Sequence, residues 1–78
     1  MVYGTEIDFE GNEEVKILVA MRLIPTRSGE AVLLLSMIDG TSYAVKGHKD
    51  DIEEYVTCIK LSEYVNFSFS SLEIMQIR

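Results

Sequence analysis

The dipeptide Asp39-Gly40 lies between two apolar runs, and it constrains the fold of this 78-residue chain more than any other feature. Asp-Gly between alternating strands indicates a hairpin, because a two-residue type I′ turn requires positive φ at both positions. With these two residues as the loop, Leu34 lies opposite Val45. The pleat of the sheet then places four apolar side chains on one face, namely Val32, Leu34, Tyr43 and Val45.

A further strand is predicted before this hairpin. Residues 14–24 alternate in polarity, and a turn with proline and glycine follows at residues 24–30. The alternation predicts one face made of Val15, Ile17, Val19, Met21 and Leu23. Residues 30–38 are apolar on both faces, as is typical of a central strand covered on both sides. We therefore expect residues 14–47 to form a three-stranded antiparallel meander.

Weaker strand signals flank this meander. Residues 2–10 alternate and end at Gly11-Asn12, which predicts a fourth strand and a turn. Residues 64–69 and 72–77 are also typical of strands, with Ser70-Ser71 between them. Because two serines are a weak turn signal, this segment is either one strand with a bulge or two separate strands.

The only helical period covers residues 50–61. Its apolar stripe consists of Ile52, Tyr55, Val56 and Ile59. Gly47 is expected to end the preceding strand. Asp50 is expected to be the N-cap, with its carboxylate accepting from the first-turn N–H groups, and Glu53 to complete a capping box.

These elements predict a single small α+β domain, residues 1–78. It is an antiparallel sheet of four to six strands with one helix packed on one face, in the order ββββαβ(β). A helix of about 12 residues is only about 18 Å long and covers one face of the sheet. The other face keeps apolar side chains that a soluble monomer seldom exposes as a large patch. We expect a second copy to cover it, in a homodimer; the alternative is that the terminal strands fold over it.

Composition excludes several functions. Thirteen acidic and seven basic residues give a net charge of −6, which disfavours direct binding to nucleic acid. No apolar stretch reaches the roughly 20 residues of a membrane span, and no signal peptide is expected. The single cysteine, Cys58, rules out an internal disulfide and fits a reducing compartment, so a cytoplasmic location is predicted.

No catalytic, cofactor or metal-ligating constellation is evident. His48 is the only histidine, and His48-Lys49-Asp50-Asp51 has no strong metal-ligand spacing. Cys58 lies ten residues further on, at the edge of the apolar stripe, which is typical of a small hydrophobic side chain at a core boundary. There is no glycine-rich phosphate loop. We therefore predict no enzymatic activity and no cofactor.

Two functional hypotheses remain. The first is a non-enzymatic interaction or regulatory module that acts through protein–protein contacts with an unidentified partner. Its predicted interaction surface consists of His48, Asp51, Glu53 and Glu54. The second is an acidic inhibitor that blocks a nucleic-acid-binding protein surface, of a type found in phages and mobile elements. The second hypothesis requires the acids of residues 6–14 and 50–54 to share one face.

Overall fold

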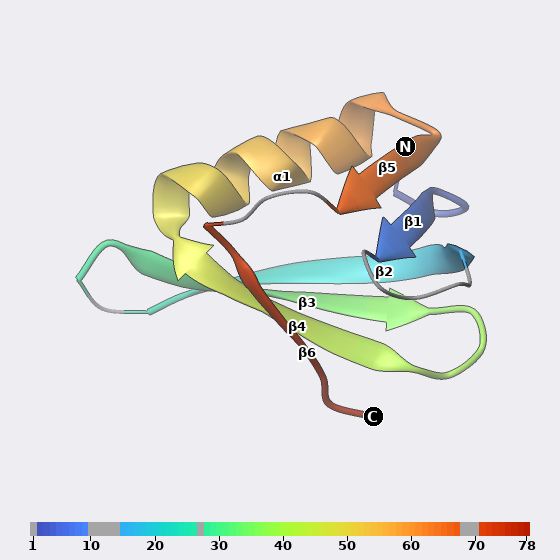
Figure 1. The fold of residues 1–78 in the computed structure, drawn as a ribbon, viewed down its shortest axis with the longest axis horizontal. Coiled ribbons are helices and arrows are strands. Elements are labelled where there is room, and N and C mark those ends of the chain that lie inside the picture. Colours follow the sequence, from blue (N-terminus) through green and yellow to red (C-terminus); the bar gives the residue numbers. More distant parts are fainter. Residues whose placement is uncertain (1, 10–14, 27, 68–70) are drawn as a thin grey trace.

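Six strands and one helix are formed by the residues that the computed structural model describes, which are residues 2–9, 15–26, 28–67 and 71–78. In chain order they are β1 (Glu6–Phe9), β2 (Val15–Pro25), β3 (Glu30–Met37), β4 (Ser42–His48), α1 (Lys49–Leu61), β5 (Tyr64–Phe67) and β6 (Glu73–Gln76). This order confirms the predicted α+β fold (Figure 1). The predicted turn at Gly11-Asn12 and the first serine of Ser70-Ser71 lie outside the described residues.

One sheet holds all six strands, in the order β5-β1-β2-β3-β4-β6. Neighbouring strands are antiparallel except β1 and β5, which are parallel, so the sheet is mixed rather than wholly antiparallel. The last two strands, β5 and β6, lie at opposite edges of the sheet. Residues 64–77 therefore form two strands and not one bulged strand. They extend the sheet at its edges instead of folding over the face opposite the helix.

The helix α1 covers one face of the sheet, where it packs on β3, β4 and β5 (Figure 1). Its stripe residues Ile52, Tyr55 and Ile59 are fully buried. They meet a layer of sheet side chains that is also buried, made of Ile7, Phe9, Leu18, Ala31, Leu33, Leu35, Met37, Tyr43 and Val45. Full burial of each large apolar side chain stabilises the fold by about 1.5–3 kcal/mol. We call this side of the sheet the covered face.

The β3–β4 hairpin differs from the prediction by one residue in register. Met37 N–H donates to Thr41 at 2.9 Å, and Gly40 N–H donates to Met37 at 3.1 Å with φ +90° at Gly40. The loop is therefore three residues with a left-handed glycine, a type I turn followed by a bulge, and not a type I′ pair. Leu33 consequently lies opposite Val45, and Leu35 opposite Tyr43. The prediction that Val32 and Leu34 share a face with Tyr43 and Val45 was wrong.

A β-bulge in β2 also changes which side chains face the helix. Leu18 lies opposite Met37, but Ala20 lies opposite Ser36, so one extra residue is inserted at Val19. Before the bulge, Leu18 faces the helix. After the bulge, Met21 and Leu23 face the helix, because they lie opposite Leu35 and Leu33. The predicted single face from Val15 to Leu23 therefore divides between the two sides of the sheet.

The strand β4 does not end at Gly47, as the sequence had suggested, but continues to His48. Gly47 instead permits a close approach of the chain leading into β6. A Cβ atom at this position would lie 2.4 Å from Leu72 Cδ2 and 3.3 Å from the carbonyl oxygen of Ser71. Since Leu72 is buried, a side chain at residue 47 would push β6 away from its place beside β4.

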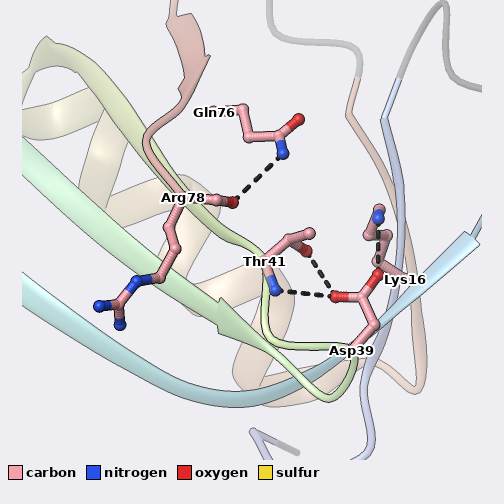
Figure 2. Close-up of polar contacts among 5 residues, drawn as sticks. All are labelled: Lys16, Asp39, Thr41, Gln76 and Arg78. Carbon is pink, nitrogen blue, oxygen red and sulfur yellow. Dashed lines mark hydrogen bonds and ion pairs between the residues drawn. The ribbon is translucent and has the colours of Figure 1, made fainter.

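The tip of the β3–β4 hairpin is tied to β2 by Asp39 (Figure 2). Its carboxylate accepts from Lys16 Nζ at 2.7 Å, from Thr41 Oγ1 at 2.6 Å and from Thr41 N–H at 3.0 Å. The bond from Lys16, followed by those from Thr41, holds the pKa of the Asp39 carboxyl well below its usual range. This contact fastens three consecutive strands at one end.

Candidate interaction surface

The predicted acidic surface lies on the first two turns of α1 and faces solvent. Glu53 and Glu54 are exposed, Asp51 is half-buried, and His48 is exposed just before the helix. This placement follows from the amphipathic period, because Ile52 and the other stripe residues turn toward the sheet. The structure therefore brings these four residues to one end of α1, and only His48 of the four also lines the small pocket between β4 and the chain leading into β6.

His48, and not Asp50, is the N-cap of α1. Strand and helix are directly consecutive, and the His48 Nδ1 atom accepts from the backbone N–H of Asp50 at 3.2 Å. A neutral imidazole can accept in this way at the nitrogen that carries no proton. The predicted capping box was therefore wrong as well, since the third helical position is Asp51 and Glu53 lies beyond it. The negative charges of Asp50 and Asp51 still interact favourably with the positive end of the helix dipole.

The β2–β3 turn supports this helix start from the other side. Lys49 N–H donates to the carbonyl oxygen of Gly29 at 2.8 Å. Ser28 and Gly29 both have positive φ, at 61° and 76°. A Cβ atom on Gly29 would lie 3.6 Å from His48 Nε2, so the turn and the imidazole are in contact. His48 is thus part of the structural joint between β3, β4 and α1.

The described acids do not share one face. Ile7 and Phe9 are buried beneath the helix, so the alternating residues Glu6 and Asp8 turn away from it. Glu53 and Glu54 lie on the outer side of the helix, in the opposite layer. Asp8 is also engaged, because Tyr64 donates to it at 2.6 Å and this hydrogen bond raises the pKa of the Tyr64 phenol. Among described residues, this arrangement weighs against the acidic-inhibitor hypothesis.

His48 and Cys58, the two side chains considered for a nucleophile and base pair, lie apart. His48 precedes α1 and Cys58 is in its third turn, so they are separated by roughly 15 Å along the helix axis. Tyr55, whose phenol pKa is raised by burial, is enclosed in the core. Within the described ranges, no three histidine, cysteine, aspartate or glutamate side chains group so as to hold a metal ion.

The opposite side of the sheet from α1, which we call the open face, carries a second set of apolar side chains. They come from β2, β3, β4 and β6, and lie in register across these strands as Ile24, Val32, Leu34, Ala44 and Met75. All are half-buried except Met75, which is 64% exposed. An apolar second face was predicted from the sequence, but Val32 and Leu34 were grouped with Tyr43 and Val45, because the composition of each face depends on the hairpin register.

A groove runs along the β6 side of the open face, with a volume of about 880 Å³. It is lined by Val32, Ala44 and Lys46 of β3 and β4 and by Glu73 and Met75 of β6. Thr26, Glu30 and Ile74 complete the lining. The groove is therefore an apolar channel bordered by charged side chains of both signs.

Comparison of the chain with protein-family models, with curated proteins and with solved structures found no match. Among the described residues, no helix is long and apolar enough to cross a membrane.

Proposed function

We propose that the chain is a non-enzymatic protein-interaction module and that its open face binds a second copy of the chain. The observation that supports this most directly is the unequal covering of the sheet. One face is packed under α1, whereas Ile24, Val32, Leu34 and Met75 on the other retain exposed area. Contiguous apolar area of this kind on a small protein is typical of an interaction site.

The charge on the open face favours a second copy over an unrelated partner. The whole chain has a net charge of −6, so two copies repel each other across most of their surfaces. The part of the open face that β2, β3, β4 and β6 form instead carries Arg22 and Lys46 together with Glu30 and Glu73, whereas Glu6 and Asp8 lie further out, on β1. Two copies can therefore approach through this part of the face with charges of both signs on each side. Such a contact is isologous and closes as a two-fold dimer.

The positions of β5 and β6 support a second copy over the alternative that these strands fold across the apolar face. β5 pairs only with β1 at one edge and β6 pairs with β4 at the other. Neither strand covers Leu34 or Val32, which lie near the centre of the sheet. Of the two alternatives for covering the open face, the terminal strands and a second copy, this favours a second copy.

The test compares two exposed apolar side chains of similar size. Met75→Glu places a charge on the open face, and Leu61→Glu places one at the end of α1, where Leu61 is 81% exposed. Sedimentation equilibrium of the wild type at tens of micromolar should give a mass near twice 8.8 kDa. Met75→Glu should give the monomer and Leu61→Glu the dimer, with unchanged circular dichroism. A monomeric wild type would refute the proposal.

Two further parts of the proposal concern the helix and the cell compartment. The exposed group of His48, Asp51, Glu53 and Glu54 remains a predicted second contact, for a basic protein surface. We also propose a cytoplasmic location, which the single free thiol of Cys58 supports because reducing compartments preserve such thiols.

A further inference from the structure

Two opposite charges lie at the two ends of the open face. Arg22 is on β2 and Glu73 is on β6, and both are exposed. They belong to the same side of the sheet. Arg22, Leu34, Ala44 and Met75 form one row of cross-strand partners on this side, and Glu73 is two residues before Met75 on β6. Three strand spacings of about 4.8 Å and an offset of about 7 Å along the strands place their backbones roughly 16 Å apart, so the two side chains do not pair within one chain.

The surroundings of Arg22 are apolar. Its cross-strand neighbour is Leu34, and the positions that flank it on the same side of β2 are Ala20 and Ile24. A guanidinium above such a surface has its long stem packed and its planar head free to form a bidentate pair with a carboxylate. Arginine with apolar neighbours is also a composition that interface centres favour.

We propose, on the basis of the dimer proposed above, that Arg22 of each copy forms an ion pair with Glu73 of the other copy. A two-fold axis that lies between the two copies, parallel to the strands and midway between Leu34 and Ala44, exchanges the β2 side with the β6 side. Arg22 then lies above Met75 of the second copy. Glu73 is two residues along the same strand, about 7 Å away, within reach of the arginine side chain. Symmetry produces this pair twice in each dimer.

This pair determines which partner the open face accepts. Apolar side chains such as Val32 and Leu34 associate with many apolar surfaces, since the hydrophobic effect has no direction. Charges fixed at the two ends of the face instead select a surface with the same charges in reversed order, and like-charge contact rejects others. A second copy of this chain presents that reversed order by symmetry.

The experiment uses charge reversal with rescue on mixing. Arg22→Glu alone and Glu73→Arg alone each create like-charge contacts in a homodimer, and each should weaken dimerisation at least about tenfold. Mixed in equal amounts, the two variants should form a heterodimer, because both cross-copy contacts are then between opposite charges. The double variant Arg22→Glu/Glu73→Arg should dimerise within about threefold of the wild type. Dissociation constants are measured by fluorescence energy transfer between labelled copies.

A matched control separates this pair from a general charge effect. Glu54→Arg makes the same change in net charge as Glu73→Arg, but on the outer side of α1, and should leave the dissociation constant unchanged. Wild-type dimerisation by both single variants, or no recovery on mixing, would overturn the ion pair. The dimer itself is tested separately by Met75→Glu. If Met75→Glu is monomeric while both charge-reversal variants dimerise like the wild type, the proposed dimer is retained and the ion pair is rejected.

Discussion

The two faces of the sheet are built from the same kinds of residue but have different roles. Along β3, buried and half-buried residues alternate, so Leu33 and Leu35 are fully buried under α1 whereas Leu34 between them faces outward. The covered face is an interior that holds the fold together. The open face is partly exposed to solvent, and in the proposed dimer it is the interface. Hydrophobicity alone therefore does not distinguish a core from an interface in a strand apolar on both sides.

The largest expected effect tests this difference on adjacent leucines. Leu33→Ala should lower the free energy of unfolding by about 2–5 kcal/mol, because it leaves a cavity beneath the helix. Leu34→Ala should cost only about 1 kcal/mol, since it removes area that is partly in water already. Both are measured by urea unfolding in the Met75→Glu background, where dimerisation does not contribute. Equal losses would mean that the two faces are not as different as their exposure indicates.

A smaller effect is expected where the covering helix begins. His48→Ala removes the side-chain acceptor for the Asp50 N–H, so it should destabilise the protein by about 1 kcal/mol. His48→Asn supplies another acceptor at the N-cap and should stay near the wild-type stability. Thermal unfolding followed by circular dichroism provides the comparison. If both variants lose stability equally, His48 stabilises the protein through its packing against the Gly29 turn and not through helix capping.

The smallest effect concerns acid and the contact at the hairpin tip. The pKa of Asp39 is depressed in the folded protein, so its ionised form stabilises the fold above the ordinary carboxyl value of about 3.9. This stability is lost as the pH falls below that value, because the unfolded chain then binds the proton more readily. Asp39→Asn should therefore lose less stability than the wild type between about pH 4 and pH 2.5. Parallel melting temperatures of the two proteins across this range would contradict the assignment.

The order of the elements was predictable because the central meander and the helix have strong local signals. Alternation identified β2, the run apolar on both faces identified β3, and the Asp39-Gly40 turn identified the hairpin that β3 forms with β4. The stripe from Ile52 to Ile59 identified α1. The register was not predictable in the same way, since Asp39-Gly40 suits a two-residue loop and also a three-residue loop with a left-handed glycine. The bulge at Val19 has no sequence signal, because valine is as common in regular strands.

The candidate surface was predicted only in part for the same reason. Residues 30–38 indicated that both faces of the sheet would be apolar, which anticipated an open face. Which leucines lie on it depends on the pairing with β4, and the position of Met75 depends on where β6 joins the sheet. The cap at His48 was missed because Asp50 is the better local candidate. Only the direct passage from strand to helix decides between them.

The parallel pairing of β1 with β5 has a consequence for how the chain assembles. Asp8 and Tyr64, which are hydrogen-bonded across these strands, are 56 residues apart in sequence. Hairpin contacts within β2, β3 and β4 close short loops and can form early, whereas β1 gains its second neighbour only after α1 has crossed the sheet. During synthesis on the ribosome, β1 emerges among the first strands, yet one of its edges remains without a partner until β5 follows. We therefore expect this half of the sheet to be the last to acquire protection from hydrogen exchange.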